Sequence, residues 1–136
     1  MLVVDASAMT ELLLGRPAGE SVTAALREHD FDLHAPHLVD VEVLSALRRV
    51  VAAGDASRTR AAEAIVDLLD LPLQRYAHEE LVPRIWELRE NFSAYDSAYL
   101  ALAEVVAEEG APLLTSDTRL ARAASKHTGV EVILGA

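Results

Sequence analysis

Residues 2–15, LVVDASAMTELLLG, contain the pattern that decides the fold. The apolar run Leu2–Asp5 predicts a short buried strand, and Ser7–Leu14 predicts a helix that ends at Gly15. An acidic residue, Asp5, therefore stands where the strand ends and the helix begins. The same succession of strand, acid and helix recurs near the other end of the chain, where Asp117 follows a second apolar run.

Strands continue to alternate with helices between these two stretches. Further strands are predicted over residues 32–35, 73–76, 112–115 and 130–134. Helices are predicted over residues 17–29, 37–53, 57–69, 79–89, 93–109 and 117–126. This alternation is typical of an α/β fold, with a five-stranded, mainly parallel sheet flanked by helices. The length of 136 residues predicts one domain over residues 1–136.

Apolar residues at helical spacing support the predicted helices. In the helix predicted over residues 57–69, these residues are Ala62, Ile65, Val66 and Leu69. Among the larger aromatic side chains, Trp86 and Tyr99 are expected to pack in the core.

Charge and cysteine content exclude several classes of site. The chain has no cysteine, which excludes disulfides, thiolate catalysis and zinc sites built on cysteine. Its 22 acidic and 12 basic residues give a net charge of −10. This balance argues against general nucleic-acid binding and favours a basic partner protein, although carboxylates gathered around a divalent metal are neutralised by it. Arg48, Arg49, Arg58 and Arg60 could contact RNA phosphates or lie on solvated helix faces.

The N-terminal residues do not resemble a secretory leader. No basic residue precedes the first apolar run, and Asp5 interrupts that run early. No stretch approaches the roughly 18 consecutive apolar residues of a membrane span. We therefore expect a cytoplasmic protein.

Four carboxylates stand where structural roles explain them poorly. Asp5 and Asp117 follow strands, and ligands of parallel sheets bind beyond the carboxyl ends of the strands. Glu42 and Asp96 lie in largely apolar helices with no cation three or four positions away, so burial would be costly without a metal or a distant arginine. Converging carboxylates are suitable ligands for Mg²⁺. Such an ion lowers the pKa of a water bound to it, and that water can then attack a phosphodiester.

Each acid also has a structural alternative. Asp5 and Asp117 could cap the helices that follow them, Asp96 fits a capping box with Ser93, and Glu42 could face solvent. An acidic Mg²⁺ site also suits a phosphatase or nucleotidase. A phosphoacceptor receiver domain is less compatible, because it usually needs paired acids after the first strand and a lysine near the last strands. A protein that only binds partners is a third alternative.

Four segments in fixed order resemble the PIN-domain ribonucleases, specifically the VapC-type toxins of bacterial toxin–antitoxin pairs. These segments are VVDASAMTELLL with Asp5, PHLVDVEVLSAL with Glu42, WELRENFSAYDSAYLALAE with Asp96, and PLLTSDTRLARAA with Asp117. Each segment is a loose match alone, but the ordered set is specific and spans Leu2 to about Leu134.

The resemblance implies a PIN-like three-layer fold with the four acids in one cleft. It also implies Mg²⁺ or Mn²⁺ as cofactor, endonucleolytic cleavage of RNA, a homodimer, and inhibition by a cognate antitoxin. Ser7 and Thr115 match positions that support the metal site in this family. Asn91 and Tyr95 match recurring positions without an assigned chemical role.

Overall fold

The computed structural model describes residues 1–136, and its five strands form one sheet in the order β3-β2-β1-β4-β5. The strands are β1 (Leu2–Val4), β2 (Leu33–Pro36), β3 (Leu73–Tyr76), β4 (Leu113–Thr115) and β5 (Val132–Leu134). All four strand pairings are parallel, which confirms the predicted fold class. Because β2 and β3 lie on one side of β1 and β4 and β5 on the other, the winding reverses between β1 and β4.

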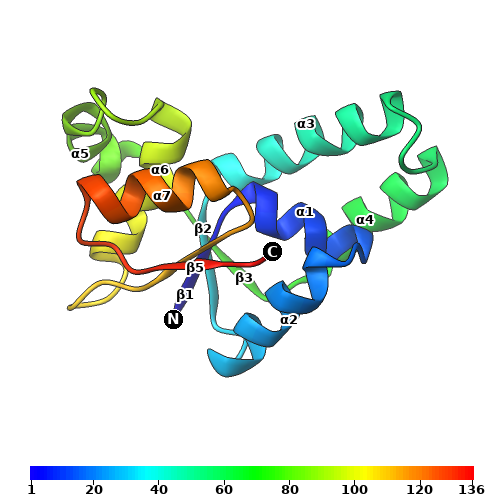
Figure 1. Cartoon of the computed structure of the whole chain (residues 1–136), viewed down its shortest axis with the longest axis horizontal. Coiled ribbons are helices and arrows are strands. Elements are labelled where there is room, and N and C mark those ends of the chain that lie inside the picture. The colour runs from blue at the N-terminus through cyan, green and yellow to red at the C-terminus, as the bar shows by residue number, and fades with distance from the viewer.

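Helices cover both faces of the sheet, as Figure 1 shows. They are α1 (Ala6–Leu14), α2 (Ala18–Glu28), α3 (Leu38–Ala52), α4 (Arg58–Asp70), α5 (Val82–Glu87), α6 (Ala94–Val105) and α7 (Thr118–His127), with a 3₁₀ turn η1 at Glu79–Leu81. In Figure 1, α3 and α4 extend beyond the sheet as an arm, and α5, α6 and α7 gather at the opposite side of the molecule. None of the helices combines the length and apolar character needed to cross a membrane.

Side-chain caps and left-handed glycines set the helix ends near their predicted places. Asp5 caps α1, Ser93 caps α6 and Asp117 caps α7, each accepting backbone N–H bonds from the first turn. Gly15 ends α1 at φ +64°, in the left-handed region that favours glycine. Helix α6 ends at Val105, four residues earlier than predicted, because residues 106–109 form a turn instead.

The core is one cluster centred on the inner strands. Every residue of β1 is fully buried, as expected for a parallel strand covered on both faces. Thirty buried residues join this cluster, including Tyr99 as predicted.

The helix predicted over residues 57–69 is present as α4, and its buried face is Ala61, Ala64 and Leu68, whereas Val66 and Leu69 are 58% and 69% exposed. One prediction about the core is wrong, because Trp86 is 66% exposed rather than buried. Its ring lies 4.3 Å from the guanidinium carbon of Arg89, in a cation–π contact at the surface.

Candidate functional site

Asp5 and Asp117 lie at the same edge of the sheet. β1 and β4 pair in parallel with Val4 opposite Leu114, so the residues that follow both strands emerge side by side. The backbone N–H of Asp5 donates to the carbonyl of Leu114 at 3.1 Å, which continues this pairing past the strand. This position is the point where the sheet reverses its winding, the usual place for a ligand in an open α/β sheet.

The carboxylate of Asp5 is buried and held by three donors. Its Oδ1 accepts from Ser7 Oγ at 2.7 Å and from the backbone N–H of Ala8 at 3.0 Å, and its Oδ2 accepts from Thr115 Oγ1. Asp5 is only 5% exposed, and burial raises its pKa to about 6 despite these hydrogen bonds, with the charge of Asp96 adding to the rise. An ionised carboxylate has about four lone-pair positions, so one on Oδ2 is still available to a ligand.

Thr115 and Ser7 connect the two strand ends. Thr115 Oγ1 donates to Asp5 and accepts from the backbone N–H of Asp117 at 3.0 Å. Ser7 Oγ donates to Asp5 and accepts from the backbone N–H of Ser116 at 2.9 Å. These hydroxyls therefore fix the position of Asp5 relative to the start of α7.

The capping role anticipated for Asp117 is also present. Its Oδ1 accepts from the backbone N–H groups of Arg119 and Leu120 at 2.9 and 3.2 Å. Its Oδ2 lies 3.9 Å from the guanidinium of Arg119, at the edge of ion-pair distance. Capping occupies one oxygen of Asp117, so it does not exclude a second role for the other oxygen.

Asp96 is the acid that links the other three. Burial raises its pKa, the nearby charge of Asp117 raises it further, and the charge of Arg119 opposes the rise. In turn, the charge of Asp96 contributes to the raised pKa values of Asp5 and Glu42. The tertiary structure thus brings all four predicted carboxylates into one electrostatically coupled group.

Glu42 enters this group from α3 and is held by a tyrosine. Tyr99, fully within the core, donates its phenol hydrogen to Glu42 Oε1 at 2.7 Å. Burial raises the pKa of Glu42, the bond from Tyr99 opposes the rise, Asp96 adds to it and Arg49 reduces it. The solvent-facing alternative for Glu42 is therefore wrong, since the side chain is half-buried and directed at the α6 side of the site.

Tyr99 is the residue of the site that sequence analysis assigned to the core alone. The available signal was its spacing: Tyr99 lies three positions after Asp96, on a helix where such residues share a face. Its hydroxyl, in addition to its ring, therefore belongs in any description of the site.

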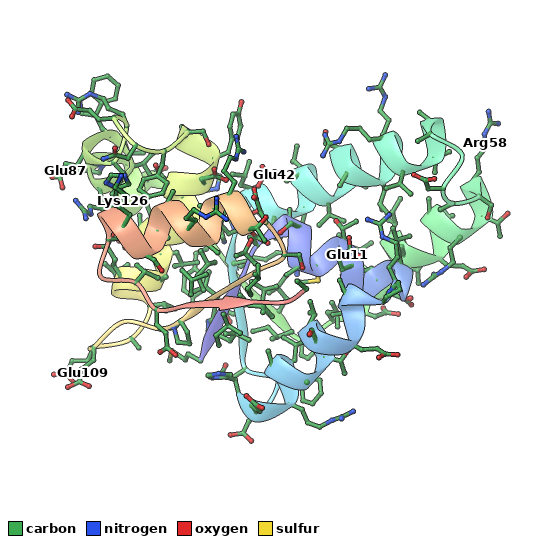
Figure 2. All side chains as sticks on the ribbon, in the orientation of Figure 1. Glu11, Glu42, Arg58, Glu87, Glu109 and Lys126 are labelled. Carbon is green, nitrogen blue, oxygen red and sulfur yellow. The ribbon has the colours of Figure 1, made fainter.

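Two small cavities border the carboxylates. One of about 280 Å³ is lined by Leu38, Val41, Glu42, Ser45, Arg49 and Tyr95. The other, of about 190 Å³, is lined by Asn91, Phe92, Ser93, Asp96, Arg119, Leu120 and Ala123. Each cavity combines one site acid with one arginine, and together they include the recurring positions Tyr95 and Asn91. Figure 2 labels Glu42 at the end of α3 nearest the sheet.

The oxygen donors of the site fit a hydrated divalent cation. The side chains that contact the Asp5 carboxylate are the hydroxyls of Ser7 and Thr115, and the charge that acts on it is the carboxylate of Asp96. Carboxylate and hydroxyl oxygens are the hard ligands that Mg²⁺ and Mn²⁺ accept. The structure does not gather three or more His, Asp or Glu side chains closely enough to enclose an ion by themselves. Mg²⁺ commonly keeps several waters and takes only one or two protein carboxylates directly, so a site with few direct ligands is compatible with it.

Comparison with known proteins gives a consistent match over nearly the whole chain. The family model described as PIN domain matches residues 2–126. Ribonuclease VapC12 of Mycobacterium tuberculosis is 38% identical over 133 residues, covering 98% of this chain and 99% of the relative. Ribonuclease VapC1 of the same species is 41% identical over 122 residues, covering 89% of each chain.

Two solved structures share the fold. PAE2754 from Pyrobaculum aerophilum superposes with a TM-score of 0.69 at 22% identity, covering 96% of this chain and 81% of its own. VapC20 of Mycobacterium tuberculosis, described as a sarcin–ricin-loop-cleaving toxin, gives a TM-score of 0.67 at 16% identity, covering 90% and 95%. At these identities the two structures support the architecture alone.

Proposed function

Because this chain belongs to the PIN-domain family, we propose that it is a divalent-metal-dependent endoribonuclease that hydrolyses RNA phosphodiesters. Its relatives over nearly the full length are VapC ribonucleases, which supports RNA as the substrate class. The observation that carries the proposal is the position of Asp5 and Asp117 at paired strand ends where the sheet reverses its winding, with Asp96 and Glu42 near enough to join them in one charged group.

The four acids have distinct tasks in this proposal. Asp5, Asp96 and Asp117 would hold the metal ion, directly or through its water ligands, with Glu42 in the same cleft as the fourth acid. A bound Mg²⁺, or Mn²⁺ in its place, would supply positive charge to the scissile phosphate and lower the pKa of the attacking water. Ser7 and Thr115 act by holding Asp5, since both donate hydrogen bonds to its carboxylate.

The biological setting proposed here follows the VapC relatives. We propose that residues 1–136 act as one PIN domain, as the toxin of a toxin–antitoxin pair in the cytoplasm. The partners are a cognate antitoxin protein and a second copy of the chain. The net charge of −10 favours an antitoxin with a basic segment that approaches the carboxylates. Size-exclusion chromatography with light scattering tests the homodimer directly.

The decisive experiment is cleavage of total RNA by purified protein, with Mg²⁺ or with a chelator, beside the variant Asp96→Asn. Asp67→Asn is the matched control, because it removes the same charge from an exposed position on α4. Cleavage that requires Mg²⁺, is lost in Asp96→Asn and persists in Asp67→Asn supports both the activity and the site.

The alternatives predict other results in the same experiment. A phosphatase or nucleotidase would hydrolyse a model phosphomonoester with Mg²⁺ and leave RNA intact. Normal cleavage by Asp96→Asn would show that the site is assigned wrongly. A folded protein, free of antitoxin, that acts on no RNA and no monoester would favour a role in binding alone.

A further inference from the structure

Helix α7 carries a basic face in an acidic chain. It contains Arg119, Arg122 and Lys126 and no acidic residue, whereas every other helix has at least as many acidic as basic residues. At 3.6 residues per turn these three side chains project within about 60° of one another, over about 10 Å of helix. We call Arg119, Arg122 and Lys126 the α7 basic face.

This face points away from the core. Leu120 and Ala124, on the other side of α7, are buried, while all three basic residues are exposed, with the Arg119 side chain 87% exposed. Neither Arg122 nor Lys126 forms an ion pair, and Arg119 reaches only Asp117 at 3.9 Å. The face is therefore available to a ligand from solution.

Helix stability explains only part of this arrangement. Lys126, in the last turn, is favourably placed against the helix dipole. Arg119 lies in the first turn, where the helix dipole disfavours a positive charge. Helix α7 also has no acidic residue that could form an ion pair with any of the three cations. Elsewhere Arg16 pairs with Glu11 and Arg84 with Glu104. Other unpaired arginines, such as Arg27 and Arg58, lie on helices that also carry acidic residues, whereas α7 gathers three cations with no acid among them.

The α7 basic face begins at the carboxylate site. Arg119 lines the 190 Å³ cavity together with Asp96, and its charge lowers the pKa of Asp96. Ala123, one turn further along α7, lines the same cavity. Lys126 lies at the far end of the helix from Glu42, as Figure 2 shows. An extended polyanion that runs from the site along α7 would therefore contact Arg119, Arg122 and Lys126 in that order.

We infer that the α7 basic face binds the backbone phosphates of a single-stranded RNA on one side of the cleaved bond. The inference rests on the proposed ribonuclease function and adds to it the direction in which the substrate leaves the site. Phosphate contacts position a strand without reading its sequence, so the face contributes affinity and register rather than choice of target. The face also gives a chain of net charge −10 a local positive surface beside the site, where a polyanion can bind.

The test measures binding of a labelled single-stranded RNA in chelator, by fluorescence anisotropy over a series of salt concentrations. The variant Arg122→Gln/Lys126→Gln removes two exposed cations and leaves Arg119 beside the carboxylates. For single strands, the slope of log K against log [salt] changes by about 0.7 per phosphate contact. We expect the double variant to reduce the slope by about 1.4 and to weaken binding similarly for RNAs of different sequence.

The control is Arg27→Gln/Arg58→Gln, which removes two exposed, unpaired arginines from α2 and α4 and should leave the slope unchanged. Thermal unfolding confirms that both double variants are folded. The inference is overturned if the α7 variant has the same salt slope of RNA binding as the unmodified protein. It is also overturned if the control variant reduces that slope as much as the α7 variant does. If the unmodified protein cleaves RNA in Mg²⁺, the proposed function survives that result.

Two further outcomes separate the explanations. If the unmodified protein neither binds nor cleaves RNA, the proposed function and the inference both fail. Poly-glutamate is the second probe: if the α7 variant loses binding to poly-glutamate while its RNA slope is unchanged, the face recognises an acidic protein segment and the inference is wrong.

Discussion

The phenol of Tyr99 donates a hydrogen bond of 2.7 Å to Glu42 Oε1, joining α6 to α3 across the carboxylate site. Burial and the adjacent acids raise the pKa of Tyr99, so the phenol stays protonated and remains a donor. The bond holds the carboxylate of Glu42 in a half-buried position and lowers its pKa relative to the value that burial alone would give. Two groups that are 57 residues apart therefore depend on each other.

Replacing Tyr99 by phenylalanine removes this donor and keeps the ring in the core. We expect a loss of about 1 kcal/mol in the free energy of unfolding, the usual net value of one hydrogen bond. The pKa of Glu42 should rise, which moves the acidic limb of the pH–rate profile of RNA cleavage to higher pH. Urea unfolding and the pH–rate profile measure the two effects. Tyr76→Phe is the control, because it removes a phenol hydrogen bond with His34 that lies outside the carboxylate group, so it should lower the stability without moving the pH–rate profile.

The raised pKa of Asp5 predicts that the metal-free protein loses stability as pH rises. Its pKa is about 6 in the folded protein against 3.8 in the unfolded chain, so folding takes up a proton between these values. The associated stability is fully present below about pH 4 and is lost as pH rises through 6, by about 3 kcal/mol from this group. Urea unfolding in chelator at several pH values tests this.

The Asp5→Asn variant isolates that effect. Asparagine at this position does not titrate. The unfolding free energy of the variant should therefore decrease less between pH 4 and pH 6 than that of the unmodified protein, and the difference should be most of the contribution from Asp5. An equal change in unfolding free energy between pH 4 and pH 6 in chelator for the unmodified protein and Asp5→Asn would contradict the assignment of a raised pKa to Asp5.

Divalent metal should stabilise the protein and weaken its pH dependence. An ion that binds only the folded state adds about 2.7 kcal/mol when its free concentration is 100 times Kd. It also favours the ionised form of Asp5, so the stability lost between pH 4 and 6 should be recovered. The measurement is Tm in MgCl₂ and in NaCl at matched ionic strength, and an equal Tm in the two salts would exclude a specific site. Asp96→Asn should show a much smaller difference between them.

Thr115 provides a matched pair of substitutions. Thr115→Val keeps the shape but leaves the buried Asp5 Oδ2 and the backbone N–H of Asp117 without a partner. We expect a cost of about 1–3 kcal/mol in unfolding free energy and a further rise in the pKa of Asp5. Thr115→Ser keeps the hydroxyl, and it should retain the activity and most of the stability. Equal effects of the valine and serine variants would mean that packing of the methyl group, rather than the hydrogen bonds, is what matters.

Local signals in the sequence determined the order and type of the elements. Apolar runs identified the strands, and Gly15 identified the end of α1, to within a few residues, because capping and turn preferences act over one turn of chain. The ends of the strands placed Asp5 and Asp117 at one edge, since neighbouring parallel strands carry the following residues there together. The sequence by itself was also sufficient to indicate the PIN-domain family.

Only the tertiary structure decided which faces and charges meet. The orientation of α4, which leaves Leu69 exposed, and the surface position of Trp86 depend on what each helix packs against, and helical spacing does not contain that information. The contact of Tyr99 with Glu42 and the coupling of Asp96 to three other acids are likewise distances in space between segments far apart in the chain. Electrostatic and hydrogen-bond energies depend on those distances. The sequence was therefore sufficient to select the four candidate acids, whereas the fold alone determines how they interact.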